Sequence, residues 1–157
     1  MSAPSLNKKV KDTSFELHGE SSKLSELRGK WLVLFFYPRD NTPGCTTEAT
    51  AFRDLSSDFE KLGAQIIGVS RDNERSHDRF TQKFDLNFPL IADTEEELCL
   101  HFDVMKEKMM YGKQVRGIER STFIIDPEGA LRHEWRKLKA KGHAEEVLET
   151  LQALTKA

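Results

Sequence analysis

The residue best suited to redox chemistry in this chain is Cys45, one of its two cysteines. It follows a stretch of turn-forming residues, Pro38 to Gly44, which contains two prolines, an aspartate, an asparagine and a glycine. Helical spacing resumes just after it. The first turn of a helix offers unpaired N–H groups and the positive end of the helix dipole, and both favour a thiolate over a thiol. Cys45 is therefore a candidate nucleophile, and the alternative is a small buried apolar residue.

The residues around this cysteine carry a family resemblance. The stretch YPRDNTPGCTTEA resembles the active-site signature of the peroxiredoxins, whose pattern Pro-x-x-x-Thr-x-x-Cys is met by Pro38, Thr42 and Cys45. The longer form, with Pro43, Gly44 and a glutamate three residues after the cysteine, is similar to the bacterioferritin comigratory protein subgroup. The similarity extends to RGKWLVLFFYP, GVSRD and RSTFIIDPEG. The resemblance implies a thioredoxin-like fold and a peroxidase that reduces hydrogen peroxide and organic hydroperoxides without a cofactor.

Thr42 and Pro38 are candidates for arranging a peroxide at the sulfur. Thr42 lies three residues before Cys45, where thioredoxin-like dithiol proteins have a second cysteine. Its hydroxyl can accept a hydrogen bond from the thiol region and donate one to a bound oxygen, so it favours peroxide chemistry over dithiol exchange. Pro38 would shield the sulfur from bulk water. The alternatives are an ordinary turn or N-cap threonine and a proline that only ends a strand.

A cation that stabilises the thiolate is also required, and the residue pattern alone does not choose among many candidates. The resemblance to the peroxiredoxins implies Arg120, which precedes the segment STFIID, as the arginine that faces the cysteine. It also implies that Glu48 orients this arginine. The alternatives are an exposed flanking charge for Arg120 and a capping or dipole role for Glu48.

The second thiol of the cycle is absent from the positions where members of this subgroup often have it. Five residues after Cys45 the chain has Thr50, and the next expected helix, residues 73–84, contains no cysteine. Cys99, in the apolar segment ELCLHF, is either a buried structural residue or a resolving thiol reached after local unfolding. We predict a one-cysteine-like cycle in which an external thiol, from thioredoxin, glutaredoxin or a small molecule, reduces a Cys45 sulfenic acid.

Two other classes of function are compatible with the same residues. A thiol-based redox sensor, suggested by the missing resolving cysteine, would turn over slowly with every reductant. A non-catalytic thioredoxin-like interaction module would keep Cys45 unreactive. The peroxidase is favoured because Pro38, Thr42, Cys45 and Arg120 occur together in one chain.

The elements that must position these residues follow from the hydrophobic pattern. Seven consecutive apolar residues, 31–37, indicate a strand buried on both faces at the centre of a sheet, and a helix is expected from about Thr46 to Leu62. The other expected elements are strands at 64–70 and 89–92, helices at 73–84, 93–102 and 143–154, hairpins at 14–23 and 121–135, and a helical turn at 24–28. Residues 104–120 show no clean period and predict a loop, or a loop with irregular strand.

This order of elements predicts one α/β domain over residues 1–157 with a central mixed sheet flanked by helices, in agreement with the thioredoxin-like fold that the resemblance implies. Residues 1–12 are polar and predict a loosely ordered N-terminus.

Composition excludes several partners. The net charge of −2 and the basic run at 132–141, which has no interleaved aromatic residue beyond Trp135, disfavour nucleic acid. No apolar run is long enough to cross a membrane. The five histidines are scattered, so no metal site is expected. With two cysteines and no apolar leader segment, we expect a cytoplasmic protein, and the family resemblance suggests a monomer.

Overall fold

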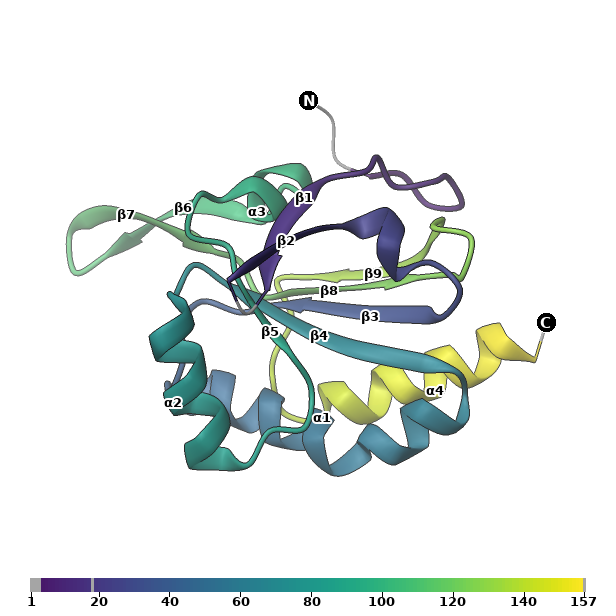
Figure 1. Ribbon diagram of the computed structural model, residues 1–157. Helices are drawn as coiled ribbons and strands as arrows, with labels where there is room; N and C mark the ends of the chain where they lie inside the picture. Colours follow the sequence, from purple (N-terminus) through teal and green to yellow (C-terminus); the bar gives the residue numbers. More distant parts are fainter. Residues whose placement is uncertain (1–3, 18, 157) are drawn as a thin grey trace.

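The computed structural model describes residues 4–17 and 19–156. Its centre is a five-stranded mixed sheet with the strand order β5-β4-β3-β8-β9 (Figure 1). The strands are β3 (Trp31–Phe36), β4 (Ala64–Ser70), β5 (Leu90–Ala92), β8 (Ser121–Ile125) and β9 (Leu131–Arg136). The first three run parallel, and β8 and β9 are antiparallel to their neighbours. The expected α/β fold with a mixed sheet is confirmed.

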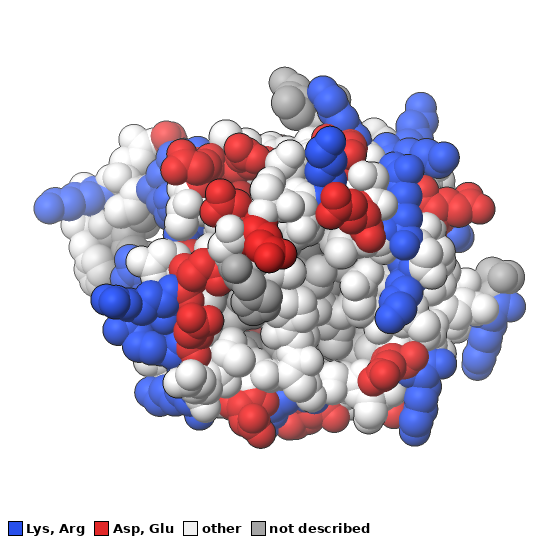
Figure 2. All heavy atoms as spheres, viewed as in Figure 1, with Lys and Arg blue, Asp and Glu red and all other residues white. Residues whose placement is uncertain are grey.

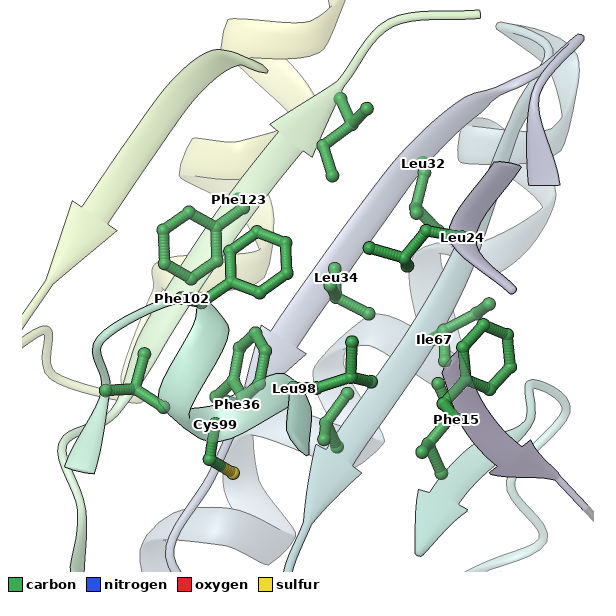
Figure 3. Close-up of a cluster of buried hydrophobic side chains, with 14 of the residues drawn as sticks. Phe15, Leu24, Leu32, Leu34, Phe36, Ile67, Leu98, Cys99, Phe102 and Phe123 are labelled. Carbon is green, nitrogen blue, oxygen red and sulfur yellow. The ribbon is translucent and has the colours of Figure 1, made fainter. Parts of the chain in front are cut away.

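Strand β3 divides the core because its side chains alternate between the two faces of the sheet. Leu32, Leu34 and Phe36 pack into one cluster of buried side chains, whereas Val33 and Phe35 pack into another. Figure 3 shows the first cluster, in which Phe36 of β3 lies near Phe102 and Phe123. Because both faces are covered, the strand reads as an unbroken apolar run in the sequence.

Each face of the sheet is covered by different elements (Figure 1). The helices α1 (Pro43–Lys61), α2 (Glu74–Phe84) and α4 (His143–Thr155) cover one face, and their apolar residues belong to the cluster of Val33 and Phe35. The other face is covered by β1 (Ser14–Leu17), β2 (Glu20–Lys23), the 3-10 turn η1 (Leu24–Leu27) and α3 (Glu97–His101). The predicted N-terminal hairpin and the helical turn after it are thereby confirmed, with His18 outside the described residues.

Helix α1 begins earlier than the apolar spacing indicated. Its first residue is Pro43 rather than Thr46, and Thr42 takes the N-cap position. A proline suits the first helical position, because its fixed φ matches the helix and its missing N–H would have had no partner there. Cys45 is therefore the third residue of the helix.

The segment expected as a loop at 104–120 is instead a regular hairpin, and that expectation was wrong. Strands β6 (Met105–Met110) and β7 (Lys113–Ile118) pair in an antiparallel ladder of six residue pairs. They are joined by Tyr111 and Gly112, which both have positive φ, as a tight hairpin turn requires. The hairpin extends away from the sheet (Figure 1), so most of its side chains are exposed on both faces and give no alternating pattern.

The N-terminal segment is also more ordered than its polar composition suggested. The N–H of Asn7 donates to the carbonyl of Leu131 at 2.6 Å, and the N–H of Val10 donates to that of Gly129 at 2.8 Å. Val10 is buried in the core. Because these bonds use the backbone, they do not depend on side-chain polarity, and the expectation of a loose terminus is wrong for residues 7–10. Residues 1–3 lie outside the described part.

Helix α3 is shorter than the expected helix at 93–102. Glu96 has a left-handed φ of 61°, so the helix begins only at Glu97. Asp93 instead accepts hydrogen bonds from the N–H groups of Leu98 and Cys99, at 3.1 and 2.8 Å. The Asp93 carboxylate thus caps α3 although Asp93 itself lies outside the first turn of the helix.

Acidic and basic side chains are interspersed over the face shown in Figure 2, with several basic side chains on the projecting hairpin. Among the described residues, none of the helices is long and apolar enough to span a membrane.

Candidate active site

Cys45 lies where the loop after β3 turns into α1, on the face of the sheet that the helices cover. Its side chain is almost fully buried, with 1 % exposed, next to the aromatic side chains of that cluster. Burial alone would also fit a structural cysteine. The groups around the sulfur therefore decide between the two interpretations.

Arg120 lies in the connection between β7 and β8, and β8 pairs directly with β3, the strand that precedes the loop of Cys45. Its Nη2 donates to Cys45 Sγ at 3.4 Å, and its Nη1 donates to Glu48 Oε1 at 2.8 Å. One guanidinium therefore spans the cysteine and the carboxylate, and its fixed fork geometry sets the direction of both contacts. Arg120 lies 72 residues after Glu48 and 75 residues after Cys45 in the chain. The structure brings together these three residues, as the resemblance implied.

Gly44 makes room for this contact and was not identified as a functional residue from the sequence. A Cβ atom at Gly44 would lie 3.0 Å from Arg120 Nη2, which is tighter than an ordinary van der Waals contact. The glycine therefore allows the guanidinium to lie against the first turn of α1. In the sequence it stands in the turn and in the family signature, and neither gave it a role of its own.

The two charged partners are largely removed from water. Glu48 is fully buried, and this burial raises its pKa to about 7, although the charge and hydrogen bond of Arg120 act in the opposite direction. The other carboxylate oxygen, Oε2, has no hydrogen-bond partner among the described residues. Burial lowers the pKa of Arg120, but the charges of Glu48 and Cys45 outweigh it, so this pKa lies above its usual value. Arg120 is thus a permanent cation beside the sulfur.

Thr42 and Pro38 lie on the same loop but make less direct contacts. The hydroxyl of Thr42 donates to the carbonyl of Arg39 at 2.9 Å, and it makes no capping bond to α1 although Thr42 is the N-cap residue. Thr42 is half-buried and Pro38 is exposed. Their expected roles toward a peroxide remain predictions.

Cys99 lies on the other face of the sheet. It packs in the cluster of Leu34 and Phe36 (Figure 3). Cys45 packs in the other cluster, that of Val33 and Phe35. Burial, together with the neighbouring carboxylate of Asp93, raises the pKa of the Cys99 thiol well above its usual range. With the sheet between them, the two cysteines are poorly placed for a direct disulfide, which disfavours Cys99 as a resolving residue.

A second group of polar residues at the same loop had no signal in the sequence. Asp40 is buried and contacts Tyr37 and His77, at 2.6 and 2.7 Å. His77 is 37 residues further along the chain, on α2, so no spacing pattern relates the two. Within the described residues, there is no group of three or more His, Cys, Asp or Glu side chains that could hold a metal ion.

Comparison with known proteins identifies the family of the chain. The model of the AhpC/TSA family matches residues 2–134. Peroxiredoxin Bcp of Xanthomonas campestris is 54% identical over 138 residues, which are 88% of this chain and 86% of the relative. Peroxiredoxin Bcp of Bacillus subtilis is 53% identical, with 88% of both chains covered.

The chain is also similar in fold to solved structures of this family. One of the bacterioferritin comigratory protein of Xanthomonas campestris, concerned with its alkyl peroxide reduction activity, has a TM-score of 0.86 and 52% identity, covering 90% of this chain and 91% of the other. A structure of a cysteine-to-serine mutant of Xylella fastidiosa PrxQ has a TM-score of 0.89 and 43% identity, covering 98% and 99%.

Proposed function

The chain belongs to the AhpC/TSA family, as a peroxiredoxin of the Bcp type, and on that premise we propose how its own residues reduce a peroxide. It is a thiol peroxidase: a peroxide is its substrate and a thiol its reductant. The relatives thus favour catalysis over the alternative of a non-catalytic interaction module. We assign the reacting sulfur to Cys45.

In the first half-reaction the Cys45 thiolate attacks one oxygen of a hydroperoxide. An S–O bond forms and the O–O bond breaks, so that the sulfur is oxidised to a sulfenic acid and the peroxide is reduced. The second oxygen leaves as hydroxide or alkoxide and takes a proton to become water or an alcohol. Arg120 stabilises the thiolate beforehand and the negative charge that moves onto the oxygens during attack. Glu48 fixes the guanidinium, and Thr42 and Pro38 border the peroxide.

The observation that carries this assignment is the guanidinium of Arg120 between Cys45 Sγ and Glu48 Oε1, at 3.4 and 2.8 Å. A structural cysteine in an apolar cluster has no need of a buried cation beside its sulfur. We propose hydrogen peroxide and organic hydroperoxides as substrates, the latter supported by the alkyl peroxide reduction activity of the Xanthomonas campestris relative.

In the second half-reaction an external thiol attacks the Cys45 sulfenic acid, releases water and forms a mixed disulfide, which a second thiol then cleaves. We propose thioredoxin, glutaredoxin or a small-molecule thiol as this reductant, because Cys99 lies across the sheet. We further propose that the enzyme is a monomer made of one domain and works in the cytoplasm, where its two free cysteines stay reduced.

The deciding experiment is intact mass spectrometry of the reduced protein after one equivalent of hydrogen peroxide, quenched within seconds in the presence of a sulfenic-acid trap. We expect one trapped adduct per chain at Cys45, also in the Cys99→Ser variant and not in the Cys45→Ser variant. An untrappable disulfide would instead show that Cys99 resolves the intermediate. If Cys45 stays reduced at this stoichiometry, the assignment of Cys45 is wrong.

A further inference from the structure

The loop that carries Thr42 and leads into the first turn of α1 is anchored through one buried carboxylate. Between the end of β3 and the start of α1, Pro38, Arg39 and Asn41 are exposed, but only 7 % of Asp40 is exposed. A buried charge is costly unless it is paired and hydrogen-bonded, so its partners determine where the loop lies.

Asp40 makes contacts to three parts of the fold. Its Oδ1 accepts from the hydroxyl of Tyr37 at 2.6 Å. Its Oδ2 faces His77 Nδ1 at 2.7 Å and accepts from Ser76 Oγ at 2.8 Å. Its own N–H donates to Asp72 Oδ2 at 2.9 Å. The loop is thereby tied to the end of β3, to α2 and to the turn that follows β4, and Figure 1 shows α2 beside the first turns of α1.

His77 is held from both sides by acceptors. Nδ1 faces the Asp40 carboxylate, and Nε2 lies 3.0 Å from the carbonyl oxygen of Ile91 on β5. The Tyr37 hydroxyl, 3.5 Å from Nδ1, gives its proton to Asp40 Oδ1 at 2.6 Å. The Asp40 carboxylate and the Ile91 carbonyl cannot donate, so both ring nitrogens carry a proton and the ring is an imidazolium. Burial lowers the pKa of His77, but the hydrogen bond and charge of Asp40, the Ile91 carbonyl and the charge of Asp72 outweigh it, so the pKa lies above its usual value.

We propose that the buried pair of Asp40 and His77 positions the catalytic loop, holding residues 38–42 and the first turn of α1 where Cys45 meets Arg120, and that this pair must loosen before a reducing thiol reaches the sulfur. Asp40 and His77 are positioning residues, since neither contacts the sulfur. The proposal rests on Cys45 as the peroxidatic residue.

The two half-reactions place opposite demands on this anchor. Attack on a small peroxide requires the arginine and the thiolate in their present arrangement. Attack by an external thiol requires a sulfur that is now 1 % exposed to become reachable, which means displacement of the loop or of the first turn of α1. A weaker anchor should therefore slow oxidation and speed reduction. A residue that only adds stability to the fold would not separate the two rates in this way.

The test measures both rates separately in the full chain, by stopped-flow oxidation with hydrogen peroxide and by reduction of the oxidised protein with dithiothreitol. We expect Asp40→Asn and His77→Gln to slow oxidation about tenfold or more, as the loss of a charged hydrogen bond implies, and to speed reduction severalfold. Tyr37→Phe, which removes the hydroxyl bond to Asp40 and the longer contact to His77 but keeps both charges, should move both rates in the same directions by less. It keeps the test valid if a charge variant fails to fold.

The matched control is His101→Gln, because His101 is also a buried histidine but lies on the other face of the sheet, and its ring nitrogens have no hydrogen-bond partner among the described residues. Both of its rates should stay within about twofold of wild type. If the anchor variants slow both half-reactions alike, or change neither, the proposal is overturned. If wild-type Cys45 itself does not react, the proposed function fails instead.

A pH series gives an independent readout. The charged groups that face His77 are Asp40 and Asp72, and the hydroxyl of Tyr37, whose pKa is raised well above its usual value by burial and by Asp40, lies nearby. As pH rises through the pKa of His77, the wild type loses the imidazolium, whereas His77→Gln has no such group. The ratio of their oxidation rates should therefore fall toward one at high pH. A ratio independent of pH would contradict the imidazolium.

Discussion

At the scale of single residues, the chemistry depends on one guanidinium that satisfies two partners. Among the described residues, Arg120 is the only side chain that donates a hydrogen bond to Cys45 Sγ, and Glu48 holds it in place. A lysine is a single charged point on a flexible stem and does not reproduce this fork. The geometry of the fork, in addition to its charge, should therefore matter.

We predict that Arg120→Lys slows oxidation of Cys45 by hydrogen peroxide about 30- to 100-fold, because one directed, charge-assisted contact is worth roughly 2–3 kcal/mol in a buried site. Stopped-flow measurement of the second-order rate constant checks this. Arg132→Lys, a conservative change at a partly exposed arginine beside Trp31, is the control and should leave the rate unchanged. A loss of less than threefold in Arg120→Lys would show that charge alone suffices.

Cys99→Ser should leave turnover unchanged. The residue is buried in the opposite cluster, so it has no route to the sulfenic acid without disruption of the sheet. Its cost should appear in stability instead, at about 1 kcal/mol, because a hydroxyl replaces a thiol in an apolar site. Steady-state rates with dithiothreitol and urea unfolding measure the two effects. A large fall in turnover with normal stability would restore Cys99 as a resolving residue.

The residues that could be found from the sequence were those close to the cysteine or covered by the family resemblance. Thr42 and Cys45 lie within four positions of each other, so local spacing sufficed. Arg120 lies 75 residues away from Cys45, and only the resemblance selected it. Asp40 and His77 were missed, because a buried ion pair between a loop and a helix produces no periodic pattern in the chain.

At the scale of elements, the first turn of α1 is shaped to admit the arginine. Gly44→Ala should increase helix propensity by up to about 1 kcal/mol, since alanine favours a helix over glycine. Its Cβ would at the same time displace Arg120 Nη2, only 3.0 Å away. We predict stability equal to or above wild type together with oxidation slowed about tenfold, the effect of weakening one charged contact. Urea unfolding measures the stability, and stopped-flow kinetics measure the rate of oxidation. Unchanged oxidation would mean that the guanidinium adapts.

Gly112→Ala is the counterpart of this variant in the projecting hairpin. Gly112 has a φ of 76°, and open space surrounds the position of a Cβ atom. The variant should lose about 1 kcal/mol of stability, because alanine is disfavoured at this positive φ, and the loss should be confined to the β6–β7 turn. Hydrogen exchange should quicken in residues 105–118, whereas oxidation of Cys45 should stay as in wild type. Slower oxidation would reveal a link between the hairpin and the site.

The same difference between local and long-range signals explains which elements were predicted. Strands β3 and β4 are buried on both faces, so their apolar runs identified them. The β6–β7 hairpin is exposed on most of its surface, and its register is set by backbone bonds and a turn with two positive φ angles. The bonds of Asn7 and Val10 to the β8–β9 hairpin are likewise backbone bonds. Neither the β6–β7 hairpin nor these N-terminal backbone bonds leave a periodic signal in side-chain polarity.

At the scale of the whole molecule, two buried titratable groups give folding stability opposite dependences on pH. Burial raises the pKa of Glu48 to about 7 from an ordinary 4.5, so between these values the native state keeps a proton that the unfolded chain has lost. This contribution to stability falls as pH rises. Burial lowers the pKa of His143 to about 4 from an ordinary 6.5, although the hydrogen bond and charge of Glu146 act in the opposite direction. Below pH 6.5 the unfolded chain therefore takes up a proton that the native state does not. This contribution falls as pH falls.

The two contributions overlap between pH 4.5 and 6.5, where they cancel in wild type. Removing either group should expose the other with a slope of roughly 1.4 kcal/mol per pH unit, the value for one proton. As pH rises across this window, the free energy of unfolding of Glu48→Gln should thus increase relative to wild type. That of His143→Gln should decrease relative to wild type. Urea unfolding at several pH values checks both slopes. If the curves of unfolding free energy against pH are parallel for wild type and both variants, neither group has a different pKa in the folded and unfolded states. If the slopes of the two variants have the same sign, the opposite effects of burying an acid and a base are contradicted.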